Sequence, residues 1–195
     1  MQDISLHLMD IMQNSLVVDS TYVEVGITAE KEENLLTVYV KDDGWGMDEE
    51  TIKKVSDPFY TTRTTRKAGL GIPMFTLAAE QAGGHVHIDS EKGKGTVITA
   101  TFQIDNIDRK PLGDIAGTIT TTIMGHPDIE FHLLLKSDKK DSEGNEYSYI
   151  FKTEDVRSQI GEVPIDDIVI IDYLNNEIKT QIERVFGGIL DEIIS

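Results

Sequence analysis

Three basic residues, Arg63, Arg66 and Lys67, lie within a five-residue stretch that contains no acid. On an acidic protein such a patch is a candidate site for a small anion, although a solvated basic loop is an equally good interpretation. The sequence Gly69-Leu70-Gly71 follows at the start of a predicted helix, where backbone N–H groups and the helix dipole favour phosphate. Gly-x-Gly is also a common helix entry, so neither feature is specific by itself.

Acidic and amide side chains are concentrated at two other positions. Asp10 and Asn14 are four residues apart on a predicted helix, so they lie on one face, about 6 Å apart along the axis. The segment DDGWG, residues 42–46, has two acids directly after a predicted strand and glycines on both sides of the only tryptophan. A surface Asp/Asn pair is usually just solvated, and a D-x-G-x-G string is often a plain turn. The order and separation of these motifs are more specific than any one of them.

The spacing of apolar residues predicts the elements that hold these motifs. Residues 57–68 show no periodic apolar pattern and are predicted to form a long loop. The predicted elements are helix 4–18, strands 22–28 and 36–40, helices 48–55 and 69–82, strands 85–90 and 96–104, a helix between Pro111 and Gly125, a hairpin of 132–136 with 147–152, and helices 154–160 and 166–186.

Composition excludes several classes of function. The chain has 195 residues, enough for one large domain or two small ones, and no cysteine, which excludes disulfides, thiolate metal sites and a cysteine nucleophile. The lack of cysteine also fits a cytoplasmic protein. The formal net charge of -17 argues against nucleic acid or an anionic membrane as a general partner. No apolar run is long enough to span a bilayer.

Taken together, the motifs resemble those of the GHKL superfamily of ATP-binding domains, which includes the histidine kinases. MQNSL matches the N-box, DDGWGM the first glycine box, DPFYTTR the F-box and lid, AGLGIPM the second glycine box, and GKGTVITATF the closing strand. The resemblance covers about residues 1–104 and is closest to histidine-kinase catalytic domains and stand-alone anti-sigma-factor kinases.

The resemblance implies a role in adenine binding for one group of residues. In the family the first acid of the D-x-G-x-G box, here Asp42, accepts a hydrogen bond from the adenine amino group. Gly44 and Gly46 would let the backbone approach the base, because a side chain there would fill the pocket. Thr96 matches the threonine near the adenine-bound water. Trp45 either flanks the pocket or is buried as ordinary core.

The resemblance also implies a triphosphate site with magnesium. Asn14 matches the asparagine that holds Mg²⁺, an ion for which one amide oxygen plus waters and phosphates is sufficient. Gly69, Leu70 and Gly71 form the second glycine box, whose backbone N–H groups would bind phosphate. Thr62 and Arg63 fall where the family has hydroxyl and basic contacts to the terminal phosphates.

This sequence departs from the family at the N-box acid. Gyrase-like enzymes and anti-sigma kinases usually have a glutamate general base there, whereas this chain has Asp10, whose carboxylate is retracted by more than ~1 Å. Asp10 would act as a base or orient a magnesium-bound water. No phosphoacceptor helix pair is expected before the N-box, and His7 is expected to pack or cap locally on the same helix face as Asp10.

The predicted fold is therefore an α/β two-layer sandwich of the Bergerat type, a mixed sheet with helices on one face, over residues 1–104. A small α+β domain of unknown role is predicted for 105–195. The predicted function is Mg-ATP binding with phosphoryl transfer to a separate protein, as in a signal-transducing kinase. An ATP-gated regulatory binding module and a slow gyrase-like ATPase remain alternatives. The oligomeric state is not predicted.

Overall fold

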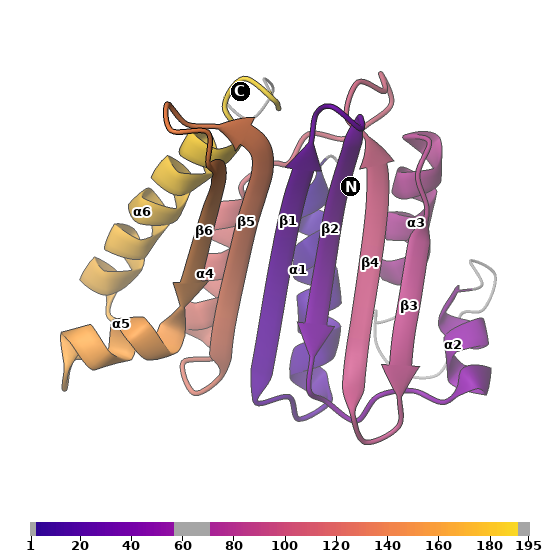
Figure 1. Ribbon diagram of the computed structural model, residues 1–195. Helices are drawn as coiled ribbons and strands as arrows, with labels where there is room; N and C mark the ends of the chain where they lie inside the picture. Colours follow the sequence, from indigo (N-terminus) through magenta and orange to yellow (C-terminus); the bar gives the residue numbers. More distant parts are fainter. Residues whose placement is uncertain (1–2, 57–70, 191–195) are drawn as a thin grey trace.

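The computed structural model describes residues 3–56 and 71–190. Its centre is a six-stranded mixed sheet with the strand order β3-β4-β2-β1-β5-β6 (Figure 1). All neighbouring strands pair antiparallel except β1 and β5, which run parallel. The strands are β1 (Tyr22–Glu30), β2 (Leu35–Asp42), β3 (Val86–Glu91), β4 (Gly95–Gln103), β5 (Glu130–Lys140) and β6 (Glu146–Lys152).

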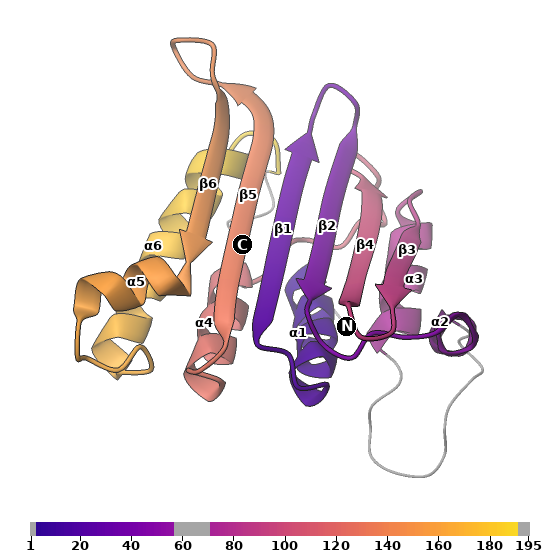
Figure 2. The ribbon, with the colours of Figure 1, turned by 60° about the horizontal axis from the view of Figure 1, so that its bottom comes forward.

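The helices form a layer on one face of this sheet. Figures 1 and 2 show α1, α3, α4 and α6 behind the strands, while α2 lies beyond the β3 edge and α5 lies near the start of β5. The helix bounds are α1 (Ile4–Val17), α2 (Glu49–Ser56), α3 (Gly71–Gln81), α4 (Ile115–Gly125), α5 (Thr153–Ile160) and α6 (Ile168–Phe186). None of these described helices has the length and apolarity needed to cross a membrane.

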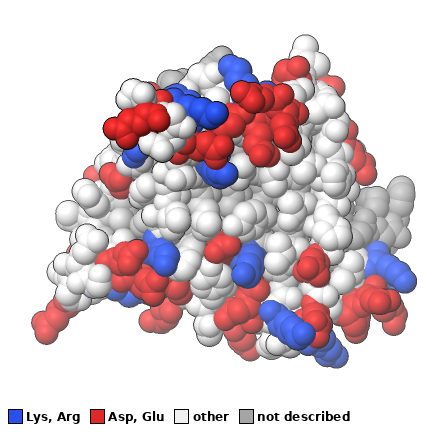
Figure 3. Space-filling view, viewed as in Figure 1, with Lys and Arg blue, Asp and Glu red and all other residues white. Residues whose placement is uncertain are grey.

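The core lies between the two layers because the apolar residues of each strand alternate toward the helices. Val23, Val25 and Ile27 of β1 are fully buried, as is the stripe Ile4, Leu8 that α1 turns toward them. Burying such side chains contributes roughly 1.5–3 kcal/mol each, before conformational entropy is counted. The other face of the sheet, called here the open face, is largely uncharged in its middle, with charged side chains gathered toward the strand ends (Figure 3).

Residues beyond 105 extend this same sheet. β5 pairs with β1 in parallel from Tyr22↔Glu130 to Ala29↔Ser137, and the backbone N–H groups of Ile4 and Ser5 donate to the carbonyls of Pro111 and Leu112 at 2.9 and 2.8 Å. The buried apolar residues on both sides of residue 105 form one cluster. The predicted mixed sheet with helices on one face is confirmed, whereas a separate small domain is not.

The structure decides two local points. His7 packs, as expected, but it is buried instead of lying on the exposed side of the helix with Asp10: it is 2% exposed and stacks on Phe75 with ring centroids 5.4 Å apart. Trp45 is 62% exposed, so of its two alternatives the core is excluded. Both outcomes have one cause: whether a side chain is covered depends on which element packs over it, and the covering element is distant in sequence.

Candidate functional site

The elements that carry the predicted motifs meet at one end of the sheet. The end of α1, the end of β2, the start of β4, the start of α3 and α2 come together there (Figures 1 and 2). They enclose a pocket of about 230 Å³. Its lining residues are Ile11, Asn14, Ser15, Val18, Asp42, Gly46, Met47, Val55, Gly71, Ile72, Thr96 and Ile98.

The pocket combines apolar walls with one buried carboxylate. Small-molecule pockets in proteins typically have volumes of ~300–1,000 Å³, so the pocket formed by the described residues lies just below this range. Side chains of Ile11, Met47, Ile72 and Ile98 contribute to these walls. Walls of this kind suit the flat faces of a heterocycle, and the few polar groups among them determine its orientation.

Asp42 is the carboxylate in this pocket, and it is 8% exposed. Ser15 donates its hydroxyl to Oδ2 at 2.7 Å, and the backbone N–H of Gly44 donates to Oδ1 at 3.0 Å. Each carboxylate oxygen can accept about two hydrogen bonds. Asp42 is therefore held in position by two donors and retains acceptor capacity for a further N–H group.

Thr96 lies directly beside this carboxylate. It is the register partner of Asp42 in the β2–β4 pair and is 9% exposed. Its hydroxyl lies 2.9 Å from that of Ser90, which also accepts the backbone N–H of Met47 at 2.8 Å. Two serines, Ser15 and Ser90, thus support the pocket without having been singled out in the sequence. The sequence feature that could have identified Ser15 is its position directly after Asn14 in the N-box.

Asp43, the second acid of the motif, faces away from the pocket and joins two strands. Its Oδ1 accepts the backbone N–H groups of Thr21 and Tyr22 at 2.9 Å each, and its Oδ2 accepts the Thr21 hydroxyl at 2.6 Å. Burial by itself would raise the pKa of Asp43, but these hydrogen bonds outweigh burial and hold the pKa below its usual value. The Asp43 carboxylate therefore links the end of β2 to the start of β1 through hydrogen bonds.

The glycines of the motif are required by contacts within the protein. Gly46 has φ +63°, and a Cβ there would lie 2.0 Å from the Glu91 carbonyl oxygen. A Cβ at Gly44 would lie 2.5 Å from the Val18 Cγ2 atom. Gly46 lines the pocket and Gly44 does not. A side chain would therefore clash with the Glu91 carbonyl at residue 46 and with Val18, the residue after α1, at residue 44, whether or not a ligand occupies the pocket.

Asn14 and Asp10 lie on the exposed side of α1 toward the start of α3. Asn14 lines the pocket, whereas Asp10 does not. Asp10 instead adjoins Gly71, the first residue of α3: a Cβ at Gly71 would lie 3.1 Å from the Asp10 Cβ. The first N–H groups of a helix have no partner within the helix, so the start of α3 presents donors close to Asp10.

The remaining predicted site residues are Thr62, Arg63, Gly69 and Leu70. They lie outside the residues that the structure describes. The described site is therefore formed by Asn14, Asp42, Gly46, Gly71 and Thr96 together, with Asp10 and Gly44 next to it.

Comparison with known proteins identifies a matching family and several similar sequences. The model of the family described as histidine kinase-, DNA gyrase B- and HSP90-like ATPase matches residues 3–106. Sporulation kinase E of Bacillus subtilis is 35% identical over 97 residues, which are 49% of this chain and 13% of that protein. Sensor histidine kinase WalK of the same organism is 37% identical over 86 residues, 42% of this chain and 14% of WalK.

These relatives are much longer than the region they share with this chain. The shared region spans well under a fifth of their length. Among solved structures, the N-terminal domain of a DNA repair protein superposes with a TM-score of 0.52 and 12% sequence identity. That superposition covers 76% of this chain and 52% of the other. At this identity the likeness concerns the fold alone.

Proposed function

Because this chain belongs to the family of histidine kinase-, DNA gyrase B- and HSP90-like ATPases, we propose that it binds Mg-ATP in the pocket beside Asp42 and transfers the terminal phosphoryl group to a separate protein. An ATP-binding domain of the histidine-kinase type occupies residues 3–106. The observation that carries the proposal is a buried, preoriented carboxylate with remaining acceptor capacity in a mostly apolar pocket.

Asp42 would recognise the adenine base. The exocyclic amino group of adenine is a hydrogen-bond donor, and a carboxylate is acceptor-only when ionised. Since Ser15 and Gly44 already orient Asp42, little side-chain freedom is lost when the base arrives. Thr96, next to Asp42 in the sheet, would complete the polar edge, while Ile11 and Ile98 would contact the ring faces.

Asn14 and the start of α3 would hold the phosphates. The donor set fits Mg²⁺, because the ion takes oxygen ligands and needs few of them from protein. Asn14 supplies an amide oxygen on the exposed side of the pocket. When bound, the magnesium ion neutralises charge on the phosphate oxygens. Gly71 and the following N–H groups at the helix start would donate to those oxygens; Thr62, Arg63, Gly69 and Leu70 are the proposed further phosphate contacts.

Asp10 is the residue proposed to act in the chemical step. It is exposed beside the start of α3, where the terminal phosphates would be bound. From there its carboxylate would accept a proton from an attacking hydroxyl or water, or would orient a magnesium-bound water. The phosphoryl group then moves from ATP to an acceptor side chain of the partner, leaving ADP.

Incubation with ATP labelled on the γ-phosphate, with and without cell lysate, tests the proposal. A labelled partner band that requires this protein, and that disappears with Asp42→Asn, would support phosphoryl transfer. Asp89→Asn, an exposed acid on β3 outside the pocket, is the matched control and should behave as wild type. Release of free phosphate without a labelled band would instead indicate a slow ATPase.

An ATP-gated regulatory binding module is the second candidate. It is supported by the pocket beside Asp42, which would serve nucleotide binding whether or not phosphoryl transfer follows. A module of this kind would bind ATP in calorimetry and bind a partner only with nucleotide present. It would yield neither free phosphate nor a labelled protein.

A further inference from the structure

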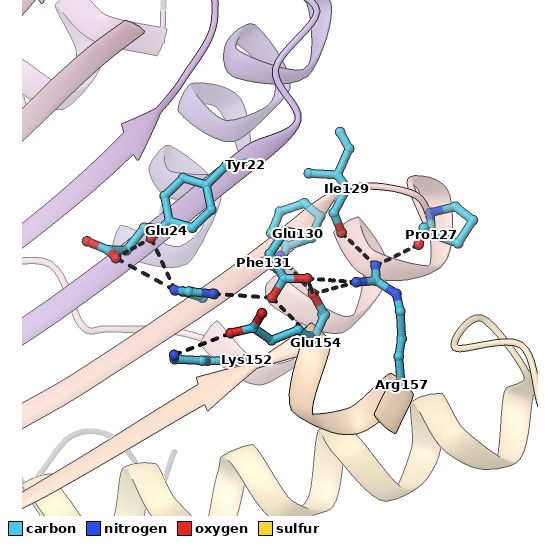
Figure 4. A network of polar contacts seen from close by, with 11 residues as sticks. Tyr22, Glu24, Pro127, Ile129, Glu130, Phe131, Lys152, Glu154 and Arg157 are labelled. Atoms are coloured by element: carbon cyan, nitrogen blue, oxygen red, sulfur yellow. Dashed lines mark hydrogen bonds and ion pairs between the residues drawn. The ribbon is translucent and has the colours of Figure 1, made fainter. Parts of the chain in front are cut away.

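A second polar cluster lies on the open face of the sheet, away from the pocket lining. It is formed at the start of β1, the start of β5, the end of β6 and the first turn of α5 (Figure 4). Its acids and its histidine come close together: one ligand atom each from Glu130, His132 and Glu154 lie within 4.8 Å of one another. We propose that these three residues form a binding site for a divalent transition-metal ion of the zinc class.

The hydrogen bonds of Tyr22 determine which nitrogen of His132 carries the proton. Tyr22 donates its hydroxyl hydrogen to Glu24 Oε2, so towards His132 its oxygen can only accept. The His132 Nδ1 atom lies 3.1 Å from that oxygen and must be the donor. In the neutral imidazole Nε2 is then unprotonated and presents a lone pair.

The lone pair of Nε2 faces a carboxylate without a hydrogen bond. Nε2 is buried and lies 3.2 Å from Glu130 Oε1, yet among the described residues it has no hydrogen-bond partner. If Nε2 carried a proton, its N–H would have to point at Glu130 Oε1 to form a hydrogen bond. The ring is not oriented for such a bond. Two atoms that bind the same tetrahedral ion do not need to point at each other, because the ion lies off the line between them. With metal–ligand bonds of about 2.1 Å, two such atoms lie about 3.4 Å apart.

Glu130 is fixed in the orientation that a ligand needs. Its Oε2 accepts Arg157 Nη1 at 2.7 Å and the Thr153 hydroxyl at 2.8 Å, and its Oε1 accepts the Glu154 backbone N–H at 2.9 Å. These three donors take up much of the acceptor capacity of the Glu130 carboxylate and fix its orientation. The hydrogen bond from Arg157 goes to Oε2, whereas Oε1 is the oxygen beside His132.

Glu154 would supply the third ligand, and its exposed side chain lies where a metal ion would enter from solvent. Figure 4 shows the Glu130 and Glu154 carboxylates side by side, with Lys152 beyond Glu154. Lys152 contacts Glu154 Oε1 at 3.3 Å, and both of these side chains are substantially exposed. A surface ion pair of this kind contributes little, so Glu154 can turn toward the ion at small cost. The fourth position would remain open to water, as in zinc sites with three protein ligands.

The surroundings of the cluster match those of known metal sites. Metal-binding histidines usually donate their other ring nitrogen to an oxygen, which fixes the ring and raises its basicity. Here that oxygen belongs to Tyr22. The Tyr22 hydroxyl in turn donates to Glu24, and Glu24 also accepts a hydrogen bond from the Tyr39 hydroxyl at 2.9 Å. An imidazole with carboxylates favours zinc or a similar ion over Mg²⁺, which prefers six oxygens.

Zinc titration of the tag-free, EDTA-treated and nucleotide-free chain tests this proposal. We expect one Zn²⁺ per chain by calorimetry and a higher unfolding temperature with zinc. Glu154→Gln and His132→Gln should each weaken binding at least ~10-fold, and Tyr22→Phe by about 10-fold. His87→Gln, an exposed histidine on β3, is the matched control and should bind as wild type. Asn14→Ala should also retain zinc, which separates this site from the proposed magnesium site.

Two results would overturn the proposal. One is zinc binding that is absent in the wild type or unchanged in both Glu154→Gln and His132→Gln. The other is an equal loss in His87→Gln, which would indicate adventitious surface binding. Glu154→Gln keeps the test valid if His132→Gln fails to fold, because the exposed Glu154 side chain makes, within the described part of the chain, a single polar contact, with Lys152. Visible absorption of bound Co²⁺ would report four-coordinate ligation in the wild type and its loss in Glu154→Gln.

Discussion

At the scale of single residues, the pocket depends on how one carboxylate is held. Asp42 receives hydrogen bonds from Ser15 and Gly44 before any ligand is present. These donors determine the direction of the remaining acceptor sites. The residue proposed to recognise adenine and the residues that orient it should therefore make separable contributions to binding.

Asp42→Asn should weaken ATP and ADP binding by roughly 1–3 kcal/mol, or about 5- to 150-fold. The amide has one acceptor oxygen in place of two, whereas Ser15, Gly44 and the adenine amino group would all donate to residue 42, so at least one donor would face an N–H₂ group. Ser15→Ala, which removes only an orienting bond, should cost ~0.5–1.5 kcal/mol. Calorimetry measures both, and unchanged affinity in Asp42→Asn would remove Asp42 from its assigned role.

His7 provides a pH-dependent contribution to stability. Burial, and then the charge of the N-terminus, lower its pKa from 6.5 to about 4. Between these values the unfolded state binds more protons than the folded state, so the contribution of His7 is full above pH 6.5 and is lost as the pH falls toward 4. The loss is at most about 3 kcal/mol. In urea unfolding at pH 7 and 4.5, His7→Leu should lose less stability between the two pH values than wild type does; equal losses would contradict this assignment.

At the scale of elements, the proposed chemical step would take place at the junction of α1 with the start of α3. Asp10 adjoins Gly71 there, and a Cβ at residue 71 would require the neighbouring atoms to shift. Because a helix start and an acid from another helix share this junction, small displacements of either element change the position of the proposed base. Catalysis is sensitive to displacements of about 1 Å.

Asp10 substitutions should distinguish a base from a structural group. If Asp10 accepts the proton, Asp10→Glu should raise phosphate release by extending the reach of the carboxylate, and Asp10→Asn should abolish turnover. Nucleotide affinity should change little in both, because a base acts in the transition state. Rates of phosphate release and dissociation constants for the three proteins measure this. If both variants instead lose affinity or stability together, Asp10 serves to hold Mg²⁺ or the α1–α3 junction.

At the scale of the whole molecule, the two parts of the chain share one sheet and one core. The parallel β1–β5 pair covers an edge of the nucleotide-binding part, and α4 contributes buried Ile115 and Ile119 to the same cluster as α1. An uncovered strand edge is a template for unwanted pairing. Residues 105–190 thus have a structural role, whatever further role they have.

A fragment of residues 1–106 should therefore be less stable than the full chain and prone to aggregation. Removal of the rest exposes the β1 edge and the buried side chains that faced α4 and β5. Circular dichroism and light scattering of fragment and full chain test this. A soluble fragment with an unchanged unfolding temperature would support the predicted independent domain of residues 1–104.

A point substitution gives the same information in the full chain. Leu133 on β5 is fully buried opposite Val25, so Leu133→Ala should destabilise by about 2–5 kcal/mol. Unfolding should remain a single transition, because the core is shared. Leu134→Ala, one residue along on the open face, is the control and should cost less. Two separate transitions in Leu133→Ala would show that the parts fold independently.

The sequence by itself determined the elements and the family. Apolar periodicity predicted α1, β1 and the last helix to within a few residues, because each of these elements buries one stripe against the same core. The order of the motifs indicated the ATP-binding fold, now supported by the family match over residues 3–106.

Tertiary structure decided what lies next to what. That Ser15 orients Asp42, that His7 is buried and that β5 joins β1 depend on contacts between segments 27 to more than 100 residues apart along the chain. The open-face cluster is the clearest case. Glu130 and His132 alternate along an ordinary-looking strand, and only the pairing of β5 with β1 and β6 brings Tyr22 and Glu154 to them. A local pattern carries no information about such partners, because pairing energy is realised only when distant strands meet.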